Sequence, residues 1–439
     1  MRWGAGTMGA FRPTVRPCPP LSAAAIITPM ETLVLGAGIV GVSTALALQQ
    51  RGHAVTLVDR QAPGRETSYG NAGIIQREAV QPYAFPRSIA TLARVATGLS
   101  NDAHYHWGAL LRLAPQLFSY WAASAPARYA PIAQAYSRLI EHCITEHRGW
   151  IEQAGASDLV HKDGWLQLYR SGPAFDAAAK QASAVAASHH LACQVLGTAA
   201  LAAAQPVLQM PLAGAVHWQD PWTVRDPGEL VARYARLFVQ RGGQLATGDA
   251  LTLRQQGSGW AVQVDSGSIS AQHAVIALGP WAGALTTRLG YRLPLFSKRG
   301  YHRHFAGGPT LTMPALDIER GVMLAPMARG LRLTTGAEFA LQDAPATPVQ
   351  LRRAEISTRE LLPLGEPVEA TPWLGARPCT ADMLPVLGPA PRHAGLWFNF
   401  GHAHQGFTLG PVTGRLVAEL ISGEAPFLDP GPYLAQRFL

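Results

Sequence analysis

The residues of this chain that could perform chemistry begin with three glycines, Gly36, Gly38 and Gly41, at the spacing G-x-G-x-x-G, followed by Asp59. Glycines at this spacing permit a tight turn, a close approach of phosphate groups to backbone N–H groups, and close packing of a helix on a strand. Asp59 could accept hydrogen bonds from a ribose with a free 2′-hydroxyl, which disfavours NADP. The pattern predicts a dinucleotide site and does not by itself distinguish FAD from NAD.

The elements that must position these residues form a β-α-β unit. Residues 32–35 are a short apolar run, which is typical of a buried parallel strand. Residues 39–51 repeat apolar side chains at helical spacing and stop before Gly52, and residues 55–58 form a second strand that ends at Asp59. The helix N-terminus would then favour the negative charge of a pyrophosphate.

A polar segment, ETSYGNAG at residues 66–73, follows the second strand closely. Its hydroxyls and backbone N–H groups could lie along a cofactor. An ordinary surface loop is an equally good interpretation of this segment taken alone.

Composition bounds the class of protein. The chain has 439 residues with 48% hydrophobic residues, enough for two or three folded domains. It has no apolar run of membrane-spanning length, so we expect a cytoplasmic protein, at most peripherally bound at an inner membrane. The net charge of +8 includes no block of Lys and Arg, which argues against a nucleic-acid partner.

The cysteines and histidines predict no metal site. Cys18, Cys143, Cys193 and Cys379 are far apart and form no C-x-x-C pair, which argues against zinc, an iron–sulfur cluster and a disulfide framework. The histidines at 142 and 147 are five residues apart, which does not place them on one helical face.

The rest of the chain alternates helical and strand patterns. Residues 1–29, rich in Pro, Gly, Arg and Ala, are expected to be a disordered extension, and residues 86–154 to be helical. Antiparallel strands are expected over 293–305 and 321–335, and an amphipathic helix over 349–361. The chain ends with a strand over 395–400, a glycine-rich turn and a helix over 411–423.

Four motifs in this order resemble those of the FAD-dependent D-amino-acid oxidase and dehydrogenase superfamily, and most resemble bacterial D-amino-acid dehydrogenases and glycine-oxidase-like enzymes. They are LGAGIVGVSTALAL with VDR, ETSYGNAG, VIALGPWAG, and GARPCTADMLPVLGP with FNFGHAHQGFTLGPVTGRLVAELI. The resemblance implies an α/β fold with a discontinuous, Rossmann-like FAD domain (30–90, 215–286 and 373–439). It also implies an α+β substrate domain built on an antiparallel sheet (91–214 and 287–372).

The resemblance also implies which residues hold FAD. The ADP half would be held by Gly36, Gly38, Ile39, Val40, Gly41, Asp59 and Arg60. The pyrophosphate and the flavin edge would lie along Thr67, Ser68, Asn71, Ala72, Gly73 and Gly279. The isoalloxazine would face Gly401, Gln405, Gly406, Phe407 and Thr408. Some relatives attach FAD through a cysteine near the G-x-R-P segment, but Gly375 and Ala376 stand there, so we expect non-covalent FAD.

The implied reaction is oxidative deamination of a D-amino acid. A hydride would pass from Cα to flavin N5, the imine would hydrolyse to a 2-oxo acid and ammonia, and a quinone or other carrier would take the electrons. Arg377 stands where the family places its clamp for the substrate carboxylate, and a structural ion pair is the alternative. Tyr301 and His402 are the further catalytic candidates, with Arg299 and His302 behind them.

Several alternatives stay open. The segments SKRGYHRHF and QREAVQPYAFPR resemble those of enzymes acting on D-proline or hydroxyproline. The chain could instead be the FAD subunit of a heteromeric amine dehydrogenase, or a glycine- or sarcosine-type oxidase that uses oxygen. An NAD-linked dehydrogenase is a further alternative, which a colourless purified protein would favour.

Overall fold

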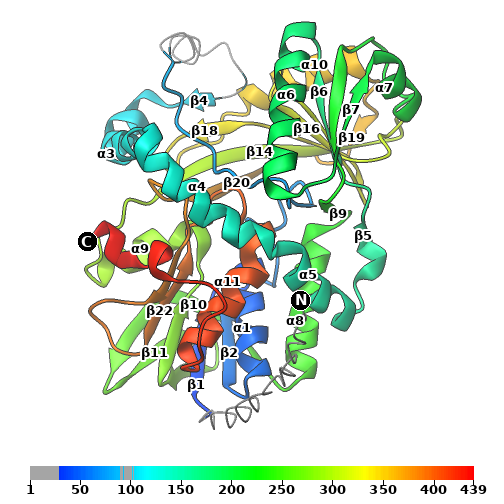
Figure 1. Ribbon diagram of the computed structural model, residues 1–439. Helices are drawn as coiled ribbons and strands as arrows, with labels where there is room; N and C mark the ends of the chain where they lie inside the picture. Colours follow the sequence, from blue (N-terminus) through cyan, green and yellow to red (C-terminus); the bar gives the residue numbers. More distant parts are fainter. Residues whose placement is uncertain (1–28, 89–91, 93–100, 102) are drawn as a thin grey trace, which may run out of the picture.

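A parallel sheet holds the predicted β-α-β unit at its centre. In the computed structural model, which describes residues 29–88, 92, 101 and 103–439, strand β1 (Glu31–Leu35), helix α1 (Ile39–Gln50) and strand β2 (Ala54–Asp59) follow one another (Figure 1). Strand β1 pairs in parallel with β2 on one side and with β13 (His273–Ile276) on the other. The strand–helix–strand unit predicted from the sequence is confirmed.

This first sheet has eight strands within the described residues. In spatial order they are β12 (Gly267–Ala271), β11 (Gly259–Val264), β10 (Gln244–Gln256), β2, β1, β13, β22 (Leu396–Phe400) and β21 (Val386–Pro389). The five from β10 to β22 are parallel, and antiparallel strands flank them.

Both faces of this sheet are covered, which explains why its central strand is apolar throughout. Val34 of β1 belongs to the core formed with helices α1, α8 (Pro227–Gln240) and α11 (Gly406–Ile421). Leu33 and Leu35 point to the other face, where they share a core with Trp260 and Phe398. Figure 1 shows α1, α8 and α11 lying side by side in the lower half of the molecule.

A second, mainly antiparallel sheet forms the upper half of Figure 1. In spatial order its strands are β4 (Ala103–Tyr105), β18 (Ala337–Phe339), β14 (Phe296–Ala306), β17 (Gly330–Thr334), β16 (Val322–Met327), β15 (Ala315–Asp317), β6 (Trp165–Tyr169), β8 (Gly214–Trp218) and β7 (Cys193–Gly197), with β19 (Glu366–Pro367) and β20 (Trp373–Cys379) also paired to β14. Helix α10 (Val349–Leu361) packs on β17 and β14, and α6 (Gly172–His189) and α7 (Thr198–Ala204) lie by β6, β7 and β8. The predicted fold class, an α/β cofactor domain with an α+β second domain, is confirmed.

Two segments predicted to belong to the cofactor domain hydrogen-bond within the second sheet. Strand β8, at 214–218, pairs with β6 and β7, and strand β20, at 373–379, pairs with β14. The division of the chain into domains stays a prediction.

The remaining elements connect or cover the two large sheets. A small sheet contains β3 (Ile74–Ile75), β9 (Trp222–Val224) and β5 (Val160–His161). The other helices are α3 (Trp107–Ala123), α4 (Pro126–Glu141), α5 (Cys143–Gln153) and α9 (Ala282–Arg288), with 3₁₀ turns η1 (Ser157–Leu159), η2 (Gly279–Trp281), η3 (Gly431–Tyr433) and η4 (Ala435–Phe438). No helix in the described part of the chain is both long and apolar enough to cross a membrane. The predicted extension, 1–29, lies outside the described residues except for its last one.

The closing helix begins earlier than the sequence predicts. It was expected to start at Pro411, whereas α11 starts at Gly406 and contains Pro411. Proline lacks an N–H group, so it leaves the carbonyl of the residue four positions earlier, Phe407, without its helical donor. His147 of α5 supplies that bond, because its Nε2 lies 2.9 Å from the Phe407 carbonyl oxygen. The helix therefore continues through the proline.

Candidate active site

One cavity is lined by residues of both large sheets. Its walls come from the turn between β1 and α1, the end of β2, residues 66–71, the middle of β10, the 3₁₀ turn η2, strands β14 and β20, and the segment that leads from β22 into α11. The cavity thus runs from the carboxyl ends of the parallel strands to the face of the second sheet. In parallel α/β sheets this edge is where ligands bind.

The glycines of the β1–α1 turn have physical reasons to be glycine. Gly36 has a φ of +106°, and a Cβ atom there would lie 2.5 Å from the Ala277 carbonyl oxygen. A Cβ atom on Gly41 would lie 1.7 Å from the Gly36 carbonyl oxygen. A side chain at either position would push α1 away from the sheet, so both glycines set how closely the helix N-terminus approaches the cavity.

The N-terminus of α1 is open toward the cavity. Gly38 caps the helix without a side chain, and the N–H group of Ile39 donates to Ser68 Oγ over 3.0 Å. That hydrogen bond ties the ETSYGNAG segment to the first turn of α1. Backbone N–H groups and the positive end of the helix dipole therefore face one place, which suits a phosphate group.

The end of β2 provides polar contacts next to this turn. Asp59 accepts hydrogen bonds from the N–H groups of Ala37, over 2.6 Å, and Gln61, over 2.9 Å. Arg60 lies over the ring of Trp281 at 4.4 Å and pairs with Glu66 at 3.0 Å. Asp59 is thus oriented by the turn it faces, as a ribose ligand needs to be.

A second helix N-terminus faces the same cavity from the far end of the chain. Helix α11 begins at Gly406, and Gln405 makes no side-chain capping bond to it. Gly406 and Phe407 line the cavity, and Ala403 just before them has a φ of +51°. The positive end of α11 can stabilise negative charge that develops on a group bound there.

His147 holds this helix end in place. It is fully buried, its Nε2 contacts the Phe407 carbonyl, and its Nδ1 lies 3.2 Å from the Tyr234 hydroxyl. Burial lowers the pKa of His147 to about 4, so the ring is neutral at physiological pH. A neutral ring can donate from Nε2 and accept at Nδ1, which satisfies both contacts.

Arg377 is the cation that faces the cavity from the second sheet. Its guanidinium donates to the carbonyl oxygens of Gly336, over 3.1 Å, and Thr335, over 3.3 Å. Among the described residues no carboxylate lies within ion-pair distance of the Arg377 guanidinium. Burial lowers the pKa of this guanidinium. A half-buried guanidinium that bonds only to carbonyl groups retains donors for an anionic ligand.

Two further groups stand close to Arg377 and were not predicted as site residues. Lys298 is directly opposite Arg377 in the β14–β20 pairing, and its ammonium lies 4.5 Å above the Tyr120 ring. His404 lines the cavity, and burial, with Lys298 and Arg377 nearby, lowers its pKa to about 3. Lys298 does not itself line the cavity, so the wall there combines the Arg377 guanidinium with a neutral imidazole.

The alternative clamp, Arg299, is committed elsewhere. Its Nε donates to Glu338 over 2.7 Å, and both side chains are almost completely buried. The Tyr301 hydroxyl lies 3.0 Å from the same carboxylate and accepts a hydrogen bond from the N–H group of Thr347 over 2.7 Å. This geometry supports a positioning role for Tyr301, and its hydroxyl gives the predicted catalytic role no support.

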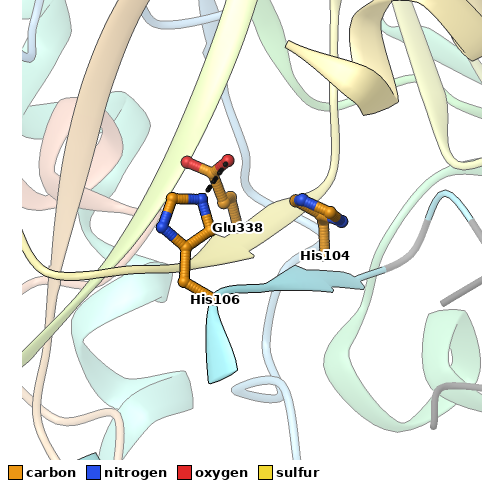
Figure 2. A group of neighbouring side chains, drawn as sticks. All are labelled: His104, His106 and Glu338. Carbon is orange, nitrogen blue, oxygen red and sulfur yellow. Dashed lines mark ion pairs between the residues drawn. The ribbon is translucent and has the colours of Figure 1, made fainter. Parts of the chain in front are cut away.

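Glu338 also lies close to two histidines. Figure 2 shows His104 of β4 and His106, at the N-cap of α3, beside this carboxylate. His106 Nε2 lies 3.6 Å from Glu338 Oε1, and the three ligand atoms are close enough to hold one metal ion. The Arg299 guanidinium already neutralises Glu338, and a metal ion would have to compete with it. We therefore interpret the group as a buried ion-pair network.

The predicted catalytic candidate His402 and the secondary candidate His302 are both buried and neutral. His402 Nε2 lies 2.9 Å from Thr413 Oγ1, which itself donates to carbonyl groups of α11, and burial lowers the pKa of His402 to about 3. His302 stacks on Trp373 at 4.7 Å, and burial lowers its pKa to about 2. Of the two, His402 lines the cavity.

Most predicted site residues line the cavity, including Arg377, Tyr301 and His402. The predicted cofactor contacts that line it are Gly36, Gly38, Ile39, Val40, Asp59, Arg60, Thr67, Ser68, Asn71, Gly279, Gly406 and Phe407. Those that do not are Gly41, Ala72, Gly73, Gly401, Gln405 and Thr408. Gly41 and Gly73 are instead packed against backbone, and Gln405 lines a neighbouring cavity.

Few features of the sequence indicated the other lining residues. Gly248 to Leu251 line the cavity at an irregularity of β10, which the sequence pattern shows only as a break between two short strands. Trp281, Trp373 and His404 also line it. Such aromatic side chains occur just as often in a core, so their types alone carried no signal.

Comparison with known proteins agrees with this geometry. A family model described as "FAD dependent oxidoreductase" matches residues 31–420. The chain belongs to this family. It is 31% identical to a D-amino-acid oxidase of Bradyrhizobium diazoefficiens, covering 92% of this chain and 98% of the relative. It is 30% identical to a D-amino acid dehydrogenase of Granulibacter bethesdensis, covering 93% and 100%.

Solved structures support the same fold. The crystal structure of glycine oxidase from Geobacillus kaustophilus superposes with a TM-score of 0.68 at 22% identity, covering 93% of this chain and all of that one. Because the chain belongs to the family of FAD-dependent oxidoreductases, FAD is its cofactor, and the cavity fits it. It offers two open helix N-termini and a carboxylate at the end of β2, and Gly36 and Gly41 keep the first of those N-termini against the sheet. We assign the α1 turn, Ser68 and Asp59 to its nucleotide half and the start of α11 to its flavin half.

Proposed function

We propose that this FAD-dependent oxidoreductase oxidatively deaminates D-amino acids and acts as a dehydrogenase. The observation that carries the proposal is Arg377, a guanidinium without a carboxylate partner among the described residues, in the cavity that α11 enters. Relatives of nearly the same length, named D-amino-acid oxidase and D-amino acid dehydrogenase, support this substrate class.

The residues of the chain would bind and orient the substrate. Arg377 would hold the substrate carboxylate with its planar pair of N–H donors, and this fixes the position of Cα. Bound FAD supplies the oxidising chemistry by accepting two electrons from the amine. The product imine then hydrolyses in water to a 2-oxo acid and ammonia.

The electrostatics of the site favour the reactive form of the substrate. Arg377 places positive charge in the cavity, Lys298 lies opposite it on β14, and His404 and His402 are neutral. Neighbouring cations and removal from water both favour a neutral amine over an ammonium group. The chain therefore needs no side chain that acts as a strong base.

Replacing Arg377 tests the proposal. Arg377→Met should retain FAD and raise the KM for D-alanine roughly 100-fold or more, because two charge-assisted hydrogen bonds are lost. Arg377→Lys keeps the charge without the planar donors, so its KM for D-alanine should lie between those of the wild type and Arg377→Met. The control Arg352→Met alters an exposed arginine of α10 and should behave as wild type. Wild-type kinetics in Arg377→Met would remove Arg377 from the carboxylate site.

A substrate panel with anaerobic flavin bleaching separates the remaining alternatives. D-Alanine and D-proline should bleach the flavin faster than their L-isomers, glycine or sarcosine. Rapid bleaching by glycine or sarcosine, with rapid reoxidation in air, would identify an oxidase instead.

For the electron acceptor we propose a membrane quinone, reached through helix α3. Trp107, Leu111, Phe118 and Trp121 lie on one face of α3 at helical spacing and are 74, 82, 67 and 36% exposed. The opposite face buries Ala109, Leu113 and Tyr120. Exposed aromatic side chains on a helix surface suit the interface of a lipid bilayer.

Vesicle binding tests this contact. The double variant Trp107→Ser with Phe118→Ser should lose co-sedimentation with vesicles containing anionic lipid and lose reduction of a quinone in them. Ile356→Ser, which removes an apolar side chain 67% exposed on α10, should not change either. Equal binding by both variants would contradict the assignment.

A further inference from the structure

A second cavity of about 340 Å³ adjoins the active site. His404 lines both cavities, and its ring lies 4.5 Å from the ring of Tyr83. Tyr83 lines the second cavity as well, and 62% of this residue is exposed. Burial raises the pKa of Tyr83, Glu78 adds to this rise and Arg377 opposes it. Tyr83 and His404 are thus the residues at which the two cavities meet.

Glu78 is the charged residue that faces this second cavity. Its side chain lies behind β3 and is only 8% exposed. One carboxylate oxygen, Oε1, accepts hydrogen bonds from Gln76 Nε2, over 2.9 Å, and Trp165 Nε1, over 3.0 Å. The other oxygen, Oε2, is buried and has no hydrogen-bond partner in the protein.

Nothing in the described part of the chain neutralises this carboxylate. No lysine or arginine lines the cavity, and the neighbouring Arg77 makes no ion pair with Glu78. Burial raises the pKa of Glu78 to about 7, and Asp220 contributes to the same shift. A buried carboxylate without a cation is costly, unless a ligand supplies one.

The rest of the cavity suits a donor-rich cation. Gln405 Oε1 is a second buried acceptor without a partner, while Trp218 Nε1 is the one such donor among the lining residues. The polar lining consists largely of glutamine side chains, Gln76, Gln81, Gln167, Gln181 and Gln405. Trp165 and Tyr169 add aromatic surface, on which a guanidinium or ammonium group can lie.

We propose that this cavity is the side-chain subsite of the enzyme, and that Glu78 selects D-amino acids whose side chain ends in a guanidinium or ammonium group. The inference rests on the proposed function, since Arg377 would hold the carboxylate of the same substrate. The cationic end would donate to Glu78 Oε2 and Gln405 Oε1, the two acceptors that lack partners.

D-Arginine and D-citrulline provide the test, because they have nearly the same shape and differ in side-chain charge. The wild-type enzyme should show a kcat/KM roughly 10- to 100-fold higher for D-arginine, the effect of one charged hydrogen bond. Glu78→Gln keeps the size of the side chain and removes its charge, so this ratio should fall to near one. The control Glu152→Gln changes an exposed glutamate of α5 and should keep the wild-type ratio.

Equilibrium binding provides a readout that needs no turnover. 5-Guanidinopentanoate carries the carboxylate and guanidinium but no amine, and 5-ureidopentanoate is its neutral counterpart. Calorimetry on the FAD-loaded enzyme should show tighter binding of the guanidinium compound in wild type and equal binding in Glu78→Gln.

The outcomes separate the inference from the proposed function. If D-alanine is oxidised but D-arginine and D-citrulline react alike, the subsite is wrong and the function stands. If no D-amino acid is oxidised, the proposed function is wrong, and the binding of 5-guanidinopentanoate and 5-ureidopentanoate then tests the subsite. Equal binding of the two compounds to the wild-type enzyme overturns the subsite. Tighter binding of the guanidinium compound, lost in Glu78→Gln, supports it.

Discussion

His147 and Pro411 together fix where the flavin end of the cavity begins, and replacing His147 by leucine tests this. Leucine removes the donor to the Phe407 carbonyl, which Pro411 has already deprived of its helical partner. A buried carbonyl without a partner costs about 1–3 kcal/mol, so His147→Leu should lower the free energy of unfolding by this amount at pH 7.5. Weaker retention of FAD should accompany the loss.

The pH dependence gives the sharper expectation. The pKa of His147 is about 4 in the folded protein and ordinarily 6.5, so its contribution to stability is complete above pH 6.5 and is lost as the pH falls toward 4. At pH 5 these two values correspond to a loss of about 2 kcal/mol in wild type, which the leucine variant does not suffer. The stability gap between the two proteins should therefore nearly close at pH 5.

Urea unfolding of the FAD-loaded proteins at both pH values measures the gap, with tryptophan fluorescence for the chain and flavin fluorescence for FAD release. The other histidines with lowered pKa values, at 302, 402 and 404, titrate in wild type and variant alike, so the difference isolates His147. The matched variant His147→Gln keeps a donor and should recover part of the stability at pH 7.5. A gap of equal size at pH 7.5 and pH 5 would refute the reasoning.

Two further changes test the architecture of the site. Gly41→Ala places a Cβ atom 1.7 Å from the Gly36 carbonyl oxygen and should abolish FAD retention on gel filtration, whereas Gly197→Ala, whose Cβ would meet nothing within 4 Å, should keep the flavin absorbance. Arg299→Met leaves Glu338 buried without its cation and should cost about 3–5 kcal/mol in urea unfolding, with much of the loss recovered when Glu338→Leu is added. A single variant as stable as wild type would show that the ion pair is dispensable.

The sequence by itself determined the β-α-β unit and much of the nucleotide half of the site. Strand and helix periodicities and the glycine spacing are local features, and the turn they specify depends on contacts among neighbouring elements. Gly36, Gly41 and Asp59 therefore have the places that the pattern predicts. The ordered motifs along the chain likewise predicted the family and FAD.

The sequence motif already favoured Arg377 as the substrate clamp, and the tertiary structure adds the reason why Arg299 is the poorer candidate. Arg299 and Arg377 lie on the paired strands β14 and β20. Successive side chains of a strand point to opposite faces of the sheet, but the sequence does not show which face borders the cavity. Only the partners decide this: Glu338, distant in the sequence, takes Arg299, and none of the described carboxylates takes Arg377.

The start of α11 and the cavity that contains Glu78 could not be predicted from the sequence, for the same reason. A proline ordinarily marks a helix start, and only His147 from another helix lets α11 continue through Pro411. Glu78 stood in a loop without a motif, and its isolation from cations depends on side chains from β6, β8 and α6. Local pattern fixes which elements form, whereas burial and charge pairing arise from contacts between residues distant in sequence, which only the folded chain brings together.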